Sequence, residues 1–171
     1  YLALRLKNAE KTKQKQEQEA PVSLISFDGD ATASLTVQNE EGTFRFLFQN
    51  QTWVLDGDEF TANPYTVSAI CSYMCNLSSV KTIAKNVTDL SPYGLSDPVK
   101  LTAVTDSGDS YQLLVGNPTP TNESYYAMLP GTTTVYTIDY TSGSVFRANK
   151  NTLKNRYLLD AYSTEITEFS L

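Results

Sequence analysis

The chain carries two groups of short β-type runs with a single helical stripe between them, and this order most constrains the fold. The first group lies between residues 22 and 55, where turn clusters such as DGD and NEEG separate the runs. Phe44, Phe46 and Phe48 occupy alternate positions in one run, so one face of that strand is aromatic. The pattern predicts an antiparallel meander with one buried face. The runs of the first group are VSLISF, ASLTVQ, TFRFLFQ and TWVL.

The helical stripe follows this first group. Asn63 is a candidate cap, and Pro64 suits the first helical position. Apolar side chains then recur at helical spacing, which predicts one amphipathic helix over residues 64–79. We expect this helix to lie across the aromatic face of the meander, because stacking closes both apolar surfaces. The stripe consists of Val67, Ile70, Cys71, Met74 and Leu77.

A linking stretch leads to the second β-type group, between residues 99 and 140. Its runs are VKLTAVT, SYQLLVG, SYYAML and TTVYTIDY, and Gly143 closes the group. They predict a second antiparallel meander. A shorter helix is predicted near 150–161, followed by the strand-like run TEITEFSL. The fold class is therefore α+β, with antiparallel β-meanders packed against one main amphipathic helix and a shorter C-terminal helix.

The composition changes at Pro21, which suggests a domain boundary. Residues 1–6 are apolar apart from Arg5, and residues 7–19 are charged and favour helix. We interpret residues 1–20 as a charged helical or disordered stalk after a missing membrane anchor. A membrane span needs about 20 apolar residues, and residues 1–6 are too few to form one, so the anchor itself is inferred. The alternative is a solvated tail of a soluble protein. Residues 21–148 are the predicted α+β domain, and 149–171 a helix-strand transition that resembles the start of a second repeat.

Charge and composition exclude several functions. Residues 1–20 hold five of the 13 basic and three of the 19 acidic side chains, which leaves eight basic and sixteen acidic for residues 21–171. An acidic body repels phosphate backbones, so nucleic-acid binding is not expected. The sequence has no His. A Ser-His-Asp or Cys-His catalytic arrangement is therefore excluded, as are the common zinc sites.

Other candidate chemistry has a simpler interpretation beside it. Cys71 and Cys75 are four residues apart, and in a helix this spacing is within reach of a disulfide. The Cβ atoms at this spacing point the same way and not toward each other. The alternative is that both cysteines are buried free thiols. Residues 78–81 (SSVK) match a serine-lysine nucleophile motif whose companion motifs are missing, and we interpret them as a solvated helix end. Three acidic groups suggest calcium or ordinary turns. They are Asp28 and Asp30, Asp56 with Asp58 and Glu59, and Asp106 with Asp109.

An ordered series of short motifs spans roughly residues 53–140. It contains Trp53, the helix, YGL at 93–95 followed by Pro98, Gly116 after LLV, YY at 125–126 and VY at 135–136. This series resembles the bacterial envelope family named domain of unknown function 4340. The resemblance implies an amino-terminal membrane anchor and an exported body, and some members resemble auxiliary parts of transport systems. It brings no catalytic residues.

The matching positions have physical interpretations. Gly94 is expected in a left-handed or tight-turn conformation, Pro98 fixes the approach to the next strand, and Gly116 allows a close turn out of the hairpin. The tyrosines are either core or ligand-facing. Our partner-binding candidates are Tyr93, Tyr125 and Tyr126, and our structural-motif residues are Trp53, Gly94, Leu95, Pro98 and Gly116.

We therefore expect a non-enzymatic binding or assembly module on the extracytoplasmic side of a cell membrane, held by an N-terminal anchor. Its partner is expected to be a protein or an envelope polymer, contacted through sheet edges and tyrosine-bearing loops. No cofactor and no metal is expected. The alternatives are a carboxylate-dependent hydrolase of an envelope glycan, which needs no His, and a structural spacer.

Overall fold

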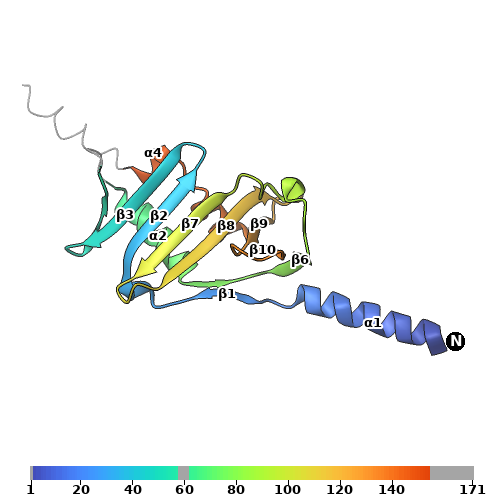
Figure 1. The fold of residues 1–171 in the computed structure, drawn as a ribbon. Coiled ribbons are helices and arrows are strands. Elements are labelled where there is room, and N and C mark those ends of the chain that lie inside the picture. Colours follow the sequence, from blue (N-terminus) through green and yellow to red (C-terminus); the bar gives the residue numbers. More distant parts are fainter. Residues whose placement is uncertain (1, 58–61, 155–171) are drawn as a thin grey trace, which may run out of the picture.

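A computed structural model describes residues 2–57 and 62–154, and eight of the strands form one antiparallel sheet (Figure 1). The strand order is β4-β3-β2-β7-β8-β9-β10-β6. The α+β fold class is confirmed. The strands are β2 (Thr32–Asn39), β3 (Gly42–Gln49), β4 (Thr52–Leu55), β6 (Lys81–Ala84), β7 (Val99–Thr105), β8 (Ser110–Pro118), β9 (Ser124–Met128) and β10 (Val135–Asp139).

Pairing between β2 and β7 joins the two meanders into this one sheet. Leu35 lies opposite Ala103, and Val37 lies opposite Leu101. Both meanders were predicted, but the contact between them was not, because strand partners far apart in sequence leave no local signal. β6 pairs with β10 at one end of the sheet. This strand was missed, because its four residues lie within the stretch that we interpreted as a linker.

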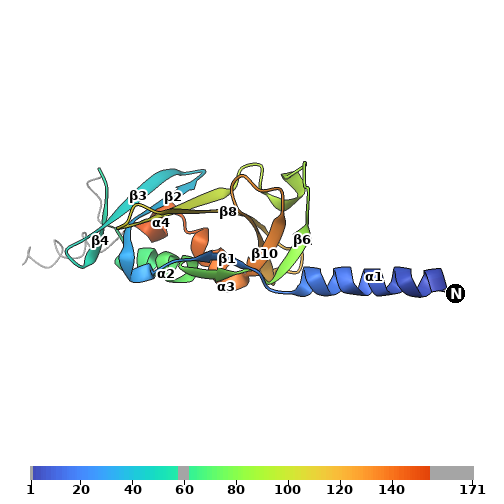
Figure 2. The same cartoon turned by 60° about the horizontal axis from the view of Figure 1, so that its bottom comes forward.

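The prediction that the run VSLISF belongs to the first meander is wrong. Part of this run forms β1 (Ser23–Ser26), which pairs with β5 (Asn76–Ser78) in a separate two-stranded sheet. A short 3-10 helix, η1 (Gly29–Ala31), follows β1 and turns the chain into β2. Because of this turn, β1 is separated from the meander and lies on the helix side of the large sheet (Figure 2).

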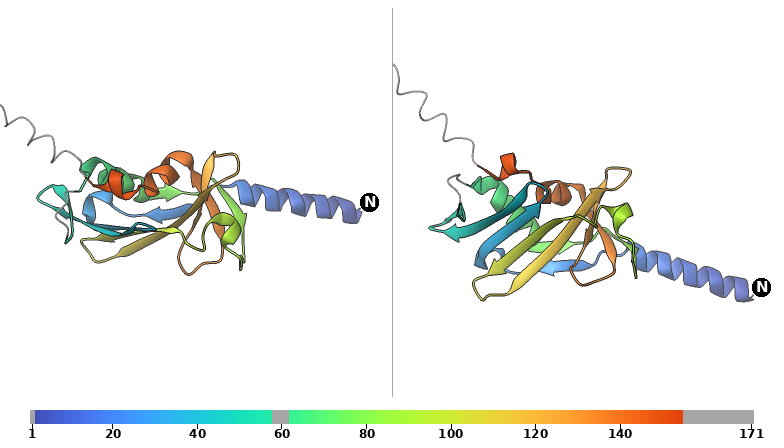
Figure 3. Two further views of the ribbon diagram at one scale, coloured as in Figure 1. Left: turned by 90° about the horizontal axis from the view of Figure 1, so that it is seen from above. Right: turned by 45° about the horizontal axis from the view of Figure 1, so that its top comes forward.

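Helices cover one face of the large sheet (Figure 3). They are α2 (Pro64–Met74), α3 (Tyr140–Phe146) and α4 (Lys150–Leu153). The opposite face is partly covered by residues 85–98, which include η2 (Ser91–Tyr93) and whose apolar side chains pack on β8, β9 and β10. The rest of the predicted helix near 150–161 and the run TEITEFSL lie outside the described residues.

α2 begins as predicted and ends earlier. The side-chain oxygen of Asn63 accepts hydrogen bonds from the backbone N–H groups of Tyr65 and Thr66, at 3.2 and 3.4 Å, so it caps the helix. The predicted helix over 64–79 is five residues too long, because the chain after Cys75 pairs with β1 as β5. The interpretation of residues 78–81 as a helix end is wrong for the same reason, since they run from β5 into β6.

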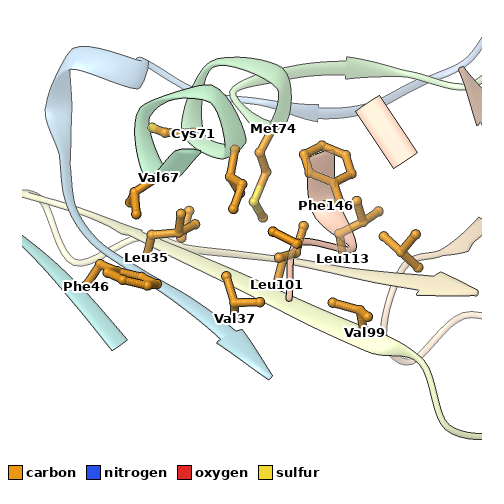
Figure 4. Packing of buried hydrophobic residues seen from close by; sticks show 14 of the residues in the cluster. Leu35, Val37, Phe46, Val67, Cys71, Met74, Val99, Leu101, Leu113 and Phe146 are labelled. Atoms are coloured by element: carbon orange, nitrogen blue, oxygen red, sulfur yellow. The ribbon is translucent and has the colours of Figure 1, made fainter. Parts of the chain in front are cut away.

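The core lies between α2 and the sheet, as predicted. Val67 and Met74 point from α2 toward the sheet, where Phe46 and other apolar side chains meet them (Figure 4). Phe44 and Phe46 are buried on this face, but Phe48 keeps 44% of its surface exposed. The aromatic face is therefore only partly covered, and its last ring stays open to solvent.

The sequence interpretation missed α3 and placed Gly143 at the close of the second meander. Gly143 lies inside α3, whose first turn is capped by Asp139: its carboxylate accepts a hydrogen bond from the Ser142 N–H at 2.9 Å. A Cβ on Gly143 would be 2.3 Å from the Tyr125 ring. The glycine is therefore required by contact between helix and sheet, a cause that a local turn pattern cannot reveal.

α1 (Leu2–Glu19) extends away from the sheet, beyond the end where β6 lies (Figure 1). Its described side chains, from residue 10 to residue 19, are all exposed. Among the described residues, no helix combines the length and the apolar character that crossing a membrane requires.

Candidate functional site

A cleft of about 410 Å³ opens between the sheet, η1 and α2. Cavities that hold ligands begin at about 300 Å³, so this one has room for a small molecule or a long side chain. Its walls come from three elements that are far apart in the sequence. The lining residues are Asp28, Gly29, Asp30, Thr32, Phe48, Trp53, Ser68, Cys71, Ser72 and Cys75.

Two aromatic rings form the sheet side of the cleft. Phe48 of β3 lies directly opposite Trp53 of β4, and the ring centroids are 5.2 Å apart with an angle of 57° between the planes. Trp53 is 6% exposed and Phe48 is 44% exposed. Phe46, two residues earlier on the same face, is fully buried. The cleft therefore lies where coverage of the aromatic face stops.

The turn between β1 and β2 supplies two carboxylates. Asp28 accepts a hydrogen bond through Oδ1 from the Asp30 N–H at 3.1 Å, and so caps η1. Both carboxylates belong to exposed residues that border the cleft. The interpretation of this acidic group as a turn is confirmed. Among the described residues, no group of three or more acidic, Cys or His side chains could hold a metal ion.

The helix side of the cleft carries two free thiols. Burial raises the pKa of Cys71; the neighbouring Cys75 and the Asp30 carboxylate add to this effect, and a hydrogen bond with Thr32 opposes it. The Cys71 sulfur lies 3.2 Å from the Thr32 hydroxyl. The Cys75 thiol donates to the Ser72 carbonyl at 3.3 Å. Cys71 therefore contributes a protonated, weakly polar surface, as the buried-thiol interpretation expects, but Cys75 is only partly buried, so that interpretation holds for one of the two thiols.

Charge in the cleft is one-sided. Its lining contains two carboxylates but neither Lys nor Arg among the described residues. Small hydroxyl groups of Ser68, Ser72 and Thr32 add hydrogen-bonding atoms on the helix and turn sides. Chemically, the arrangement offers an aromatic wall, an acidic rim and several neutral polar groups.

The three candidate tyrosines do not form one surface. Tyr125 and Tyr126 are adjacent on β9 and therefore face opposite sides of the sheet. Tyr126 meets Tyr93 in an edge-on contact, with ring centroids 5.1 Å apart and planes at 76°. Tyr125 instead packs on α3 and lies 5.4 Å from the ring of Tyr140. The partner-binding role that we predicted for these residues remains a prediction.

Three of the structural-motif residues, Gly94, Leu95 and Gly116, meet near the C-terminal end of β8. Gly94 has φ +66°, so the predicted left-handed conformation is confirmed. Gly116 does not turn the chain as predicted, because β8 continues to Pro118. A Cβ on Gly116 would be 2.1 Å from the Tyr93 carbonyl oxygen, so this glycine permits two backbones to touch. Leu95 is 2% exposed beside them, and Pro98 directly precedes β7.

Trp53 is the one motif residue that borders the cleft. Sequence reasoning identified it only as part of the motif series, and Phe48 only as part of an aromatic face. The sequence held one signal that Phe48 is the exposed ring: it is the last of three alternating aromatic residues and lies nearest the end of the strand. The contribution of Asp28 and Asp30 had no sequence signal, since an Asp-Gly-Asp turn looks the same wherever it folds.

The fold and the cleft define a small α+β module in which one antiparallel sheet, backed by helices, holds an aromatic-walled, acid-rimmed cleft at one end. No curated protein and no solved structure matches the chain. The family described as Domain of unknown function (DUF4340) matches residues 53–171, which is more than half of the chain. The chain belongs to this family, as its motif series indicated. The match begins at Trp53, the residue at the cleft wall.

Proposed function

We propose that this chain is a non-enzymatic binding module, held on the extracytoplasmic side of a membrane, whose cleft receives part of a partner molecule. The observation that carries the proposal is the Phe48–Trp53 pair at the cleft. Phe48 leaves 44% of its surface in water while its neighbour Trp53 is 6% exposed. Burying an exposed Phe stabilises a complex by about 1.5–3 kcal/mol at most, so the open ring is a ready anchor point.

The position of the pair on strands favours binding. Phe48 and Trp53 belong to β3 and β4, which are joined by a tight turn and paired in register. Aromatic side chains on regular elements lose little freedom when a partner arrives, so little of the binding energy is lost to ordering. This preorganisation suits a site whose work is recognition.

The arrangement of α1 supports a tethered module. This helix has 18 residues, which correspond to roughly 27 Å at about 1.5 Å per residue. It leaves the domain near β6, whereas the cleft lies near β3 and β4 at the other end of the sheet (Figure 1). A module anchored through α1 would therefore hold its cleft away from the membrane surface, toward partners.

The rival function is a carboxylate-dependent hydrolase, and Asp28 and Asp30 are the acids that border the cleft. Glycosidases place their two carboxyl groups on opposite sides of the scissile bond. Here both carboxylates come from the same turn, and Asp28 is already engaged as the cap of η1. This arrangement favours recognition over hydrolysis. The third hypothesis, a structural spacer, does not require a cleft with an exposed aromatic ring.

Site-specific photo-crosslinking in intact cells tests the binding proposal. A photoreactive phenylalanine analogue replaces Phe48, and in the control it replaces Tyr65, which is 86% exposed on α2 and does not border the cleft. We expect discrete adducts from position 48 that are absent from position 65. Identical adduct patterns at the two positions, or none at either, would contradict a partner-binding cleft.

The compartment is tested separately. In a variant with both native thiols replaced by serine, Gln16→Cys places one exposed thiol on α1. A membrane-impermeant maleimide should label it in intact spheroplasts as fully as in lysed cells. Labelling only after lysis would show that the module is not extracytoplasmic.

A further inference from the structure

The chemistry of the cleft specifies the kind of group that it can bind, and this inference rests on the proposed function. The sheet side offers the Phe48 ring, which is 44% exposed, and the small exposed part of the neighbouring Trp53 ring, which is 6% exposed. A cation close to an aromatic ring is attracted by the negative charge of the ring face, and tryptophan is the strongest of the aromatic residues in this respect. An apolar hydrocarbon stem can also pack against the same two rings.

The opposite rim offers negative charge. Asp28 and Asp30 both border the cleft, and no Lys or Arg is among its described lining residues. The negative charge of Asp30 also acts inside the cleft, because it helps to raise the pKa of the buried Cys71 thiol. An anionic group entering here would meet two carboxylates with no compensating cation. A neutral apolar group would form no favourable electrostatic interaction with the two carboxylates.

The intervening surface suits a long, narrow side chain. Ser68 and Ser72 of α2 line the cleft, and serine hydroxyl groups can accept hydrogen bonds from a cationic head group. Lys and Arg combine an apolar stem with a charged end, and both bury the stem while the end remains near polar groups. The net acidic balance of residues 21–171 adds a long-range attraction for a basic partner.

We propose that the cleft binds a Lys or Arg side chain presented by a partner protein, with its stem along Phe48 and Trp53 and its cationic end at Asp28 and Asp30. The partner is thus a protein with an exposed basic residue on a segment narrow enough to enter the cleft. α1 of the same molecule cannot supply this residue, because it projects from the opposite end of the sheet (Figure 1).

The probes are four synthetic pentapeptides that differ only in their central residue, which is Lys, Arg, norleucine or Glu. Trp53 is the only tryptophan in the sequence, so intrinsic tryptophan fluorescence reports on this cleft alone. We expect a saturable change with the Lys and Arg peptides, at a dissociation constant roughly tenfold below that of the norleucine peptide. The Glu peptide should give no saturable change.

Substitutions separate charge from apolar contact. Asp30→Asn should weaken the Lys peptide roughly tenfold and leave the norleucine peptide unchanged, because only the cationic end loses its partner. Phe48→Ala should weaken both. The matched control is Asp97→Asn, which removes the same charge from an exposed residue that does not border the cleft, and it should change neither.

Equal affinity for the Lys and norleucine peptides, or a Lys preference that survives Asp30→Asn, overturns the proposal. So does the absence of any saturable response to the Lys and Arg peptides at millimolar concentration. The two proposals can fail separately. Crosslinks at position 48 without Lys or Arg selectivity would leave a binding cleft of another specificity, whereas the loss of both results would remove the cleft as a binding site.

Discussion

Gly116 of β8 lies against the carbonyl oxygen of Tyr93, so closely that a Cβ on the glycine would be 2.1 Å from that oxygen. Tyr93 belongs to the segment that covers the outer face of the sheet, and Gly116 belongs to the sheet itself. The Arg147 guanidinium donates a hydrogen bond to the Gly116 carbonyl at 2.8 Å, which holds this part of β8 from the helix side. Two of the motif glycines thus serve one contact, because Gly94 provides the left-handed turn that brings Tyr93 there.

Gly116→Ala should destabilise the fold by about 3 kcal/mol, because backbone must move to admit the methyl group. Urea unfolding measures the change in free energy. The control is Gly131→Ala, where φ is +77° but no atom outside the two chain neighbours lies within 4 Å of the added Cβ, and there we expect a cost of about 1 kcal/mol from backbone conformation alone. Equal costs for the two variants would refute the close contact.

Gly143→Ala tests the contact between α3 and β9. A Gly-to-Ala change within a helix ordinarily stabilises by about 0.5–1 kcal/mol. Here we expect destabilisation by about 2 kcal/mol, because the added Cβ would be 2.3 Å from the Tyr125 ring. Repeated in a Tyr125→Ala background, the same change should cost less, because the ring atoms are gone and only the Cβ of residue 125, at 2.6 Å from the added Cβ, remains in the way. An effect of the same size in both backgrounds would show that Tyr125 is not the cause.

The two thiols should differ in reactivity and pH dependence. The thiolate is the reactive form, and burial raises the pKa of Cys71, so iodoacetamide should modify Cys75 first. Because the folded state holds the Cys71 proton more tightly than the unfolded state, its stabilising contribution is full below the ordinary thiol pKa of about 8.5 and declines as the pH rises above it. Mass spectrometry of labelled peptides checks the order of modification, and urea unfolding over pH checks the decline.

A Cys71→Ser variant is the control for that experiment. Its stability should fall less between neutral and alkaline pH than that of the original chain, since the titrating group is gone. Equal labelling rates of the two cysteines in the original chain would mean that Cys71 is more accessible than its exposed fraction of 6% implies.

Tyr93 and Tyr126 should be energetically coupled. Edge-on aromatic pairs contribute about 0.5–1.5 kcal/mol beyond their buried area, so the two alanine variants should be non-additive by that amount in a double-mutant cycle. Tyr65→Ala, which removes a ring that is 86% exposed, should change stability by less than about 0.5 kcal/mol. Additive effects of Tyr93→Ala and Tyr126→Ala would mean that the contact contributes nothing to the fold.

Local signals predicted α2 and most strands of the large sheet, but they missed α3 and β6 and placed the end of α2 too late. Asn63 and Pro64 identify the start of α2, because capping depends only on neighbouring residues. Its end was placed five residues late, because Leu77 continues the apolar stripe although it belongs to β5. Pairing with β1, more than 40 residues earlier in the chain, decided that boundary. The apolar period of a helix and a short strand after it cannot be separated by spacing alone.

The candidate site shows the same division. Trp53 and Phe48 were recognised as motif and pattern, but nothing local indicates that coverage by α2 stops at Phe46 and leaves the next ring open. Tyr125 and Tyr126 looked like one feature in the sequence. The two-residue period of a strand sends them to opposite faces, where Tyr125 packs on α3 and Tyr126 packs on Tyr93 of the segment 85–98.

The sequence by itself determined the α+β class, the two meanders, the cap of α2, the left-handed turn at Gly94 and the family, because each depends on residues close together in the chain or on their order. The tertiary structure decided that the meanders join through β2 and β7, that Gly116 and Gly143 are required by contacts with Tyr93 and Tyr125, and that a cleft opens at Phe48. These features arise where segments distant in sequence meet, and the free energy of such contacts depends on three-dimensional packing that no local pattern encodes.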